Sequence, residues 1–532
     1  MTTPSSDQPG LWQRSTTRRF LKWLFTWRTA RRVLVSFAVI ATMVALFYAE
    51  EDFRGKRAWD EYRRELEARG EQLDWKAIIP KPVPDDQNFA AIPLIQSWFV
   101  RSNAFNSDFW RQDNYGRVSD FISSSQAKKD GGSRHFTDLV AWGMAFDAIR
   151  SGKFSPSQWL ESGQLDRESR AKAVPAVLEG LKTNEVIFAE LRAASQRPYS
   201  RYPVDYDVPD PAEILLPHLN KVRAVCRRLS LKACAELALG QSEDALEDVK
   251  LMLYMDDSVR NDSTLISYLV RVACLEHAVQ PVWEGLAEHR WSDVQLQELQ
   301  ARLQQFDFVA DLKPALNAER GWGIGIIEFV KNRGKLSELT EPTGSPQASP
   351  ANLISKMVPS GWYYQEELNY GRLFEIELKG SFDATKKRVS PSRIAVGERE
   401  VDRALFARPF SAVFIHHRLM ARMLLPALGK VPRRGATAQT AADQAALACA
   451  LERYRLANGR FPETLDAFVP RFASQLPHDV ITGEPYKYHR TADGQFLVYS
   501  VGWNEKDDGG APGKTLFDID RGDWVWQYPA RP

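Results

Sequence analysis

The densest group of chemically capable side chains lies near the carboxyl end of the chain. Six acidic residues fall within nineteen positions, and Gly509 and Gly510 separate them into two groups. These residues are Glu505, Asp507, Asp508, Asp518, Asp520 and Asp523. Carboxylate oxygens on a flexible loop are the ligands that calcium prefers. Like charges held this close repel each other, so either a bound cation or full solvation must relieve them. Both interpretations stay open from these residues.

The rest of the sequence carries no recognisable catalytic pattern. None of the eight histidines has the His-Glu-x-x-His spacing of zinc hydrolases. The sequence contains neither a G-x-S-x-G nucleophile elbow nor a phosphate-binding P-loop. No reaction is therefore predicted, and the alternative is an enzyme whose acids and histidines converge only in three dimensions.

A helix and a small sheet must position the acidic loop. Two runs of alternating apolar residues flank Asp493-Gly494, a pair that tolerates the positive backbone angles of a tight turn, and they predict a β-hairpin. Trp524-Val525-Trp526 predicts a final strand. A preceding helix would lay its apolar face on this sheet to form a compact α+β unit. The apolar residues of that helix are Ala446, Leu447, Ala450, Leu451 and Tyr454.

Four segments of this region occur in a characteristic order. They are ALERYRLANGRFP, LPHDVITGEPYKY, FLVYSVGWNEKDDGG and DIDRGDW. Together, over about residues 438–528, they resemble the globular domain of the major pseudopilins of type II secretion. The resemblance implies a pseudopilin-like α+β domain at 436–532 that holds a calcium ion. It assigns the ligands to Asp507 or Asp508 together with Asp518 or Asp520.

One feature departs from the pseudopilin pattern. Pseudopilins begin with a prepilin cleavage site and a membrane helix that continues into the globular domain. Here the apolar segment lies about 400 residues upstream. We therefore expect no polymerisation through that helix, and we expect the domain to act as a docking or structural module.

The amino-terminal region predicts a membrane anchor. Residues 1–32 contain seven Lys and Arg residues and one acid, residues 33–49 are uncharged, and three acids follow. Seventeen helical residues span about 26 Å, close to a hydrocarbon core of about 30 Å. The charge asymmetry predicts a cytoplasmic tail at 1–32, a single transmembrane helix in the cytoplasmic membrane at 33–49, and a periplasmic or extracytoplasmic remainder. A cleaved signal peptide is the alternative, but it would place bulky Phe47 where a small residue is required.

The region between the anchor and the tail is predicted to be mainly helical and divided into several units. Residues 50–89 read as an amphipathic stalk followed by a proline-rich linker, and residues 90–330 as a helical body. Within it, LALGQSEDALEDVKLML resembles half of a tetratricopeptide repeat, with Gly240 at the turn, although no second copy follows. Residues 331–435 combine a linker with further helices.

Overall charge excludes a simple nucleic-acid-binding role. Lys plus Arg total 70 and Asp plus Glu total 68, so no global positive field exists. The leading hypothesis is a membrane-anchored structural or protein-interaction protein of the cell envelope that contacts the lipid bilayer and protein partners. The alternatives are an accessory of a type II secretion or pilus-like machine, and an envelope hydrolase.

Overall fold

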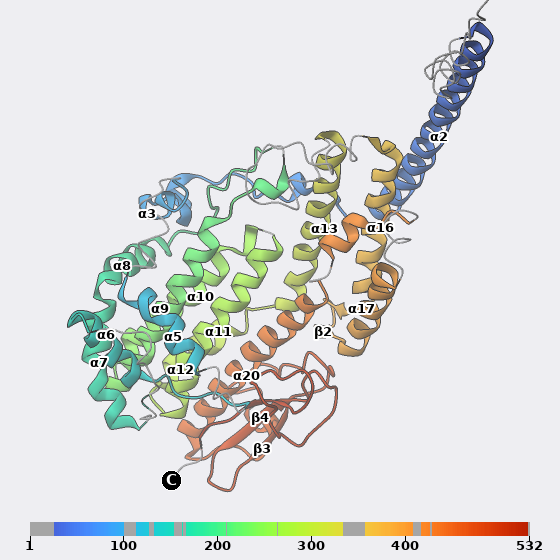
Figure 1. Cartoon of the computed structure of the whole chain (residues 1–532). Helices are drawn as coiled ribbons and strands as arrows, with labels where there is room; N and C mark the ends of the chain where they lie inside the picture. The colour runs from blue at the N-terminus through green and yellow to red at the C-terminus, as the bar shows by residue number, and fades with distance from the viewer. Residues whose placement is uncertain are drawn as a thin grey trace, which may run out of the picture.

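The chain is mainly helical, with a long helix that projects from a rounded body (Figure 1). The computed structural model describes residues 26–100, 113–126, 132–153, 162, 166–208, 210–262, 264–333, 357–407, 416–425 and 428–529. Most of the basic tail and of the expected linker at 331–350 therefore lies outside the described residues.

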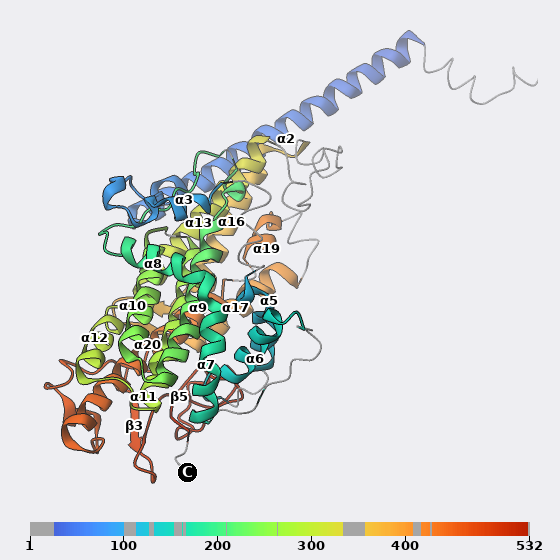
Figure 2. The same ribbon diagram turned by 90° about the vertical axis from the view of Figure 1, so that its left-hand side faces the viewer.

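The projecting helix, α2 (Trp27–Ala68), contains both the apolar segment and the expected stalk. Its apolar portion is exposed except at half-buried Tyr48, and among the described residues it is the one helix long and apolar enough to cross a membrane. The carboxyl-terminal portion, which packs on the body and is called the outer part of α2 below, buries Gly55, Trp59, Tyr62 and Leu66. These residues recur every three or four positions on one face. The apolar segment and the expected stalk therefore belong to one continuous helix (Figure 2).

Helix α16 (Ser360–Leu378) runs beside the outer part of α2 in the same direction. The backbone N–H of Gly361 donates to the carboxylate of Asp52 at 2.7 Å, and Arg69 pairs with Glu375 further along at 2.9 Å. A Cβ atom on Gly55 would collide with the carbonyl group of Gly361. Glycine at this crossing therefore permits direct backbone contact between the two helices.

The body consists of helices packed side by side, and short turns join those from α9 to α13. Gly240 takes a left-handed conformation (φ 81°) and ends α9, so that α10 folds back along it as one helix hairpin. The helices of the body are α3 (Pro93–Ser97), α5 (Asn114–Gln126), α6 (Leu139–Arg150), α7 (Arg167–Leu181), α8 (Glu185–Ala194), α9 (Pro217–Leu239), α10 (Ser242–Ser258), α11 (Leu265–Ala287), α12 (Asp293–Leu303) and α13 (Phe308–Arg333).

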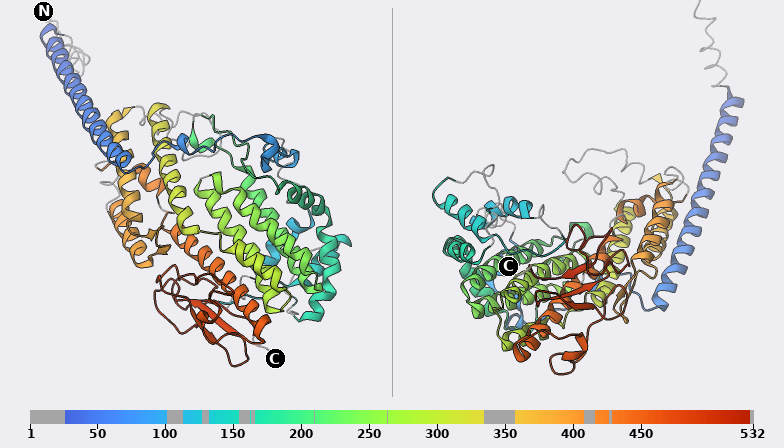
Figure 3. Two further views of the ribbon diagram at one scale, coloured as in Figure 1. Left: turned by 180° about the vertical axis from the view of Figure 1, so that it is seen from behind. Right: turned by 90° about the horizontal axis from the view of Figure 1, so that it is seen from below.

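The carboxyl-terminal sheet lies at the opposite end of the body from the projecting part of α2 (Figure 3). Its strands are β3 (Lys487–Arg490), β4 (Phe496–Ser500) and β5 (Trp524–Trp526), antiparallel in the order β3-β4-β5. Tyr488 pairs with Val498, which pairs in turn with Trp526. The predicted hairpin at Asp493-Gly494 and the predicted final strand are both present.

Helix α20 (Lys430–Asn458) joins this sheet to the helical body. On one side Gln444 donates to the carbonyl of Trp524 at 2.7 Å, and on the others α20 packs against α11, α12 and α13. One hydrophobic core therefore runs from the outer part of α2 to β5. The expected domain limit at residue 436 falls inside this helix.

Between α13 and α20 the described part of the chain adds a small hairpin and three helices. The hairpin lies between α16 and α17 and was not expected from the sequence. These elements are α16, β1 (Phe382–Asp383), β2 (Arg388–Val389), α17 (Pro391–Phe406) and α19 (Leu419–Leu424).

Candidate anion-binding pocket

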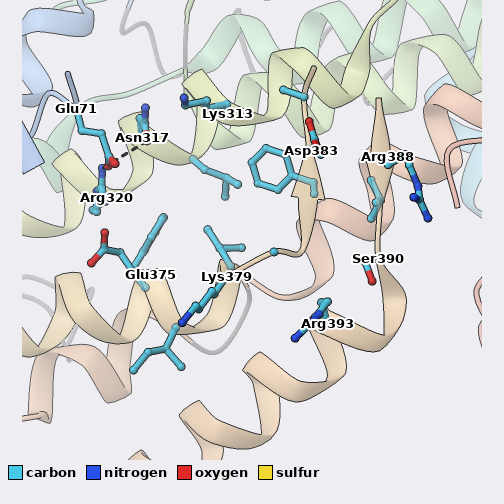
Figure 4. A pocket seen from close by; sticks show the side chains of 18 of the residues that line it. Glu71, Lys313, Asn317, Arg320, Glu375, Lys379, Asp383, Arg388, Ser390 and Arg393 are labelled. Atoms are coloured by element: carbon cyan, nitrogen blue, oxygen red, sulfur yellow. Dashed lines mark hydrogen bonds and ion pairs between the residues drawn. The ribbon is translucent and has the colours of Figure 1, made fainter. Parts of the chain in front are cut away.

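A cavity of about 1100 Å³ opens beside the outer end of α2 (Figure 4). Its walls come from four places: the residues that follow α2, the middle of α13, the second half of α16, and the β1–β2 hairpin with the start of α17. The crossing of α16 with α17 holds one wall, because a Cβ atom on Gly397 would collide with the backbone of Glu377. The pocket is thus built from segments far apart in the sequence.

Basic side chains outnumber acidic ones around this cavity, eight to three. The basic residues are Arg69, Lys313, Arg320, Arg372, Lys379, Lys386, Arg388 and Arg393, and the acidic residues are Glu71, Glu375 and Asp383. Because the whole chain is nearly neutral, this excess is local. A cavity lined by one sign of charge concentrates ligands of the opposite sign.

The three acids of the pocket have structural partners. Glu71 is bound by the guanidinium of Arg320. Glu375 accepts hydrogen bonds from Arg69 and from the Tyr62 hydroxyl, at 2.9 and 3.1 Å. One oxygen of Asp383 accepts the backbone N–H groups of the two residues after Ala384, both at 3.0 Å, and so shapes the hairpin turn. These acids fix the walls of the pocket.

Four cations remain for a ligand. No hydrogen bond or ion pair joins a described residue to the side chain of Lys313, Arg372, Lys379 or Arg393. Figure 4 shows Lys313, Lys379 and Arg393 on three different segments around the space. Their side chains are exposed, which leaves the charges hydrated and available. Opposed cations on separate elements suit a ligand with more than one negative charge.

The floor of the pocket is apolar. Leu316, Phe374 and Val389 line it and are almost completely buried. Hydroxyl groups are present at the rim, on Thr385 and Ser390, but within the described part of the chain neither one contacts a histidine or a carboxylate that could act as a base. The arrangement therefore suits binding of an anion with an apolar part.

The hairpin also ties the pocket to the carboxyl-terminal unit. Arg388 donates to the backbone carbonyl of Ile481 at 3.3 Å, and the backbone N–H of Val389 donates to the carbonyl of Val480 at 2.8 Å. The pocket wall consequently depends on the loop that precedes β3.

In the acidic loop predicted to bind calcium, carboxylates accept hydrogen bonds from backbone N–H groups of the loop itself. Asp518 accepts the backbone N–H groups of Lys514 and Asp520, at 2.7 and 2.9 Å. Asp508 accepts the N–H of Gly522 at 3.0 Å, and Asp507 accepts the N–H of Gly509 at 3.0 Å. The Asp520 side chain forms no hydrogen bond or ion pair with a described residue.

The residue that organises this loop is Asp523. It is almost completely buried, and its two oxygens accept the N–H groups of Asp508 and Gly510, at 3.2 and 2.6 Å. Among the described residues, no group of three or more His, Cys, Asp or Glu side chains is placed to hold a metal ion. Sequence reasoning counted Asp523 among the acids but did not single it out, because its role depends on burial.

The pKa values in this loop follow the same contacts. The backbone N–H of Gly509 lowers the pKa of Asp507. Burial acts to raise the pKa of Asp518, but the N–H groups of Asp520 and Lys514 outweigh it and lower the pKa. Burial raises the pKa of Asp523. The first two side chains are therefore ionised over a wider pH range than an ordinary aspartate.

A second group of displaced pKa values lies on α11. Burial, reinforced by the charges of Arg227 and Arg223, lowers the pKa of His277 to about 3. Burial also raises the pKa of Glu276, against the charge of Arg434. Neither side chain hydrogen-bonds to another described residue, so no partner orients the imidazole as a general base requires.

Sequence reasoning did not identify the cationic pocket. A local signal exists between residues 379 and 393, where five of fifteen residues are Lys or Arg. The other basic residues of the pocket lie on α13, on α16 and at the end of α2, each in an ordinary amphipathic pattern. Only packing of these helices reveals that they share one cavity.

Comparisons with known proteins do not add a family assignment. No protein-family model matches the chain, and neither a curated protein nor a solved structure is significantly similar to it. The function therefore rests on the chain's own geometry.

Proposed function

We propose that this is a membrane-anchored protein of the cell envelope that binds a multiply charged anion in the cationic pocket. The observation that carries the proposal is the convergence of four cations without described partners on an apolar-floored cavity. The acids of the pocket are already paired, so the remaining positive charge is free to act on a ligand.

The topology in this proposal comes from α2. The basic end of the helix remains in the cytoplasm, and residues after about 50 lie outside. From residue 49 to Arg69 the helix rises about 30 Å, so the pocket faces the aqueous compartment well beyond the bilayer surface. The ligand would then be a soluble anion or the charged end of an envelope polymer.

Binding is favoured over hydrolysis by the absence of a paired base. In the described part of the pocket no hydroxyl contacts a histidine, and the acids serve as ion-pair or turn partners. The hydrolase alternative would need acids or histidines outside this pocket to act, such as Glu276 or His277 on α11. Replacing His277 with Gln should leave anion binding unchanged, since α11 contributes no residue to the pocket.

We make a second, separate proposal for the carboxyl-terminal unit. By its resemblance to pseudopilins it would bind envelope protein partners, as a docking module or as an accessory of a type II secretion or pilus-like machine. The proposed calcium ion rests on the acid-rich sequence of this loop and on the same resemblance, because carboxylates are calcium's ligands. Co-purification with pseudopilins would support the secretion-machine role.

Anion binding can be tested with the full chain in nanodiscs. Tripolyphosphate serves as the probe, and calorimetry measures its affinity. Replacing Lys313 and Arg372 with Gln removes two positive charges. Each contributes about 1 kcal/mol to the binding free energy if it lies about 4 Å from a ligand charge in water, so we expect affinity to fall roughly 25-fold. The matched control replaces Lys172 and Lys182 with Gln, two exposed cations on the other side of the body.

Added salt should weaken binding to the native protein and should have less effect on the pocket variant. Failure of the native chain to bind tripolyphosphate, or equal affinities in the pocket and control variants, would remove the proposed function.

A further inference from the structure

The start of α16 lies level with the end of the apolar segment of α2. The Tyr48 hydroxyl is hydrogen-bonded to the carbonyl of Met357, and the N–H of Gly361 donates to Asp52 at 2.7 Å. The glycine crossing at Gly55 fixes this register, because any side chain there would separate the helices. Figure 1 and Figure 3 show α16 alongside α2 where that helix leaves the body.

This register sets the height of α16 above the membrane. If residues 33–49 span the hydrocarbon core, Asp52 lies three residues beyond it, about 5 Å along the helix. The headgroup layer is about 5 to 8 Å thick on each side of that core. The first turn of α16 then falls inside the headgroup layer.

The side chains at this level suit that layer. Phe53 on α2 is 69% exposed and Met357 is 63% exposed, although both are large and apolar. Trp362 and Tyr363 follow on α16 and are half-buried. Aromatic side chains concentrate at membrane–water interfaces because their rings are apolar and their edges polar.

The charges at this level are largely paired with one another. Arg54 binds Glu51 at 2.7 Å and lies 3.9 Å from Glu50. The exposed apolar side chains, in contrast, have no partner among the described residues at this level of the surface. Their continuity with the apolar face of α2 identifies the lipid bilayer as the surface that covers them.

We infer that Phe53 and the start of α16, from Met357 to Tyr363, form a second contact with the outer surface of the bilayer. The inference rests on the proposed topology of α2. With two contacts the body is held at a fixed angle to the membrane, and the cationic pocket at the far end of α16 is kept at a constant distance from it.

Site-directed spin labels on the full chain in phosphatidylcholine–phosphatidylglycerol nanodiscs test this inference. All four native cysteines are buried, so introduced surface cysteines can be labelled selectively. Labels are placed at Phe53→Cys and Met357→Cys. Val39→Cys reports the hydrocarbon core, and Val294→Cys on α12, 73% exposed, reports the aqueous phase.

Collision rates with oxygen and with a water-soluble nickel chelate measure depth. Labels at residues 53 and 357 should give oxygen-to-nickel ratios between those of the two reference positions. Ratios equal to that at residue 294, with residue 39 in lipid, would overturn the inference and leave the anchor intact. An aqueous ratio at residue 39 would overturn the proposed anchor and this inference together.

Discussion

The cationic pocket and the acidic loop show two ways in which charge is used in one chain. The pocket collects basic residues from positions 69 to 393 and leaves four of them without described partners. The loop concentrates acids within nineteen positions, and several are engaged by nearby backbone N–H groups. A high density of charged residues in the sequence therefore does not mean that their side chains are available to bind a ligand.

The reason is the distance over which each arrangement is built. In the loop, carboxylates reach backbone donors two to four residues away, except where Asp508 and Asp523 join its two ends. In the pocket, helix packing brings the cations together, and the three acids there are bound by other groups. In the loop, hydrogen bonds to the backbone engage the charged side chains. In the pocket, long-range packing leaves charged side chains exposed.

The largest expected effect comes from disturbing the packing behind the pocket. In Gly397→Leu the added side chain would collide with the backbone of α16. We expect the free energy of unfolding to fall by about 3 kcal/mol, and tripolyphosphate binding to be lost. Chemical denaturation and calorimetry measure the two effects. Ala395→Leu, on the exposed face of the same helix, is the control and should change neither.

Inside the loop, buried and exposed acids should differ sharply. Asp523→Ala would leave the buried N–H of Gly510 without its acceptor and weaken the loop by about 2 to 3 kcal/mol. Asp520→Ala removes a carboxylate with no described partner and should change stability by less than about 0.5 kcal/mol. Denaturation midpoints compare the two, and equal losses would show that the loop is not organised through Asp523.

Helix α16, which forms one wall of the pocket, and the acidic loop should respond to pH in opposite directions. Burial raises the pKa of Glu366 and Glu377 on α16 to about 7 from the ordinary 4.5. Between these values the unfolded chain has released protons that the folded chain keeps, so stability falls as pH rises, by on the order of 3 kcal/mol for each group. Replacing both with Gln should flatten this slope in denaturation measured from pH 4.5 to 8.

In the loop the sign is reversed. The lowered pKa values of Asp507 and Asp518 give stability above the ordinary pKa of about 3.8, and that stability is lost as pH falls through their folded values. Protection from hydrogen exchange at Gly509 and Asp520, measured relative to the intrinsic exchange rate at each pH, should therefore fall in acid before protection in α16 does. A simultaneous loss of protection would argue against separate control.

Calcium should have the smallest effect on stability. This experiment tests whether carboxylates of the loop can still bind a cation. If Asp507 or Asp508 with Asp518 or Asp520 binds the ion, calcium at ten times its dissociation constant stabilises the folded chain by about 1.4 kcal/mol. Thermal melting of the full chain in calcium and in chelator measures this, because α20 shares its core with the body. Asp508→Ala should abolish the difference, and magnesium should substitute poorly.

A loop fully satisfied by its backbone would melt identically in calcium and in chelator. That outcome would remove the metal site and would sharpen the contrast with the pocket.

Several elements followed directly from the sequence because their signals are local. Seventeen uncharged residues predicted the apolar part of α2, and Asp493-Gly494 between apolar runs predicted the β3–β4 hairpin. Gly240 marked the turn between α9 and α10. In each case a repeat of 3.6 or 2 residues, or a single turn, carries the information.

Sequence by itself determined a mainly helical chain with one apolar amino-terminal helix and an acid-rich end. Tertiary structure alone decided which charges are available. Lys313, Arg372 and Arg393 face one cavity because glycines at the helix crossings allow close packing, whereas Asp518 faces its own backbone. Periodicity reports which face of a helix is buried, but only packing selects the neighbours that each exposed side chain meets.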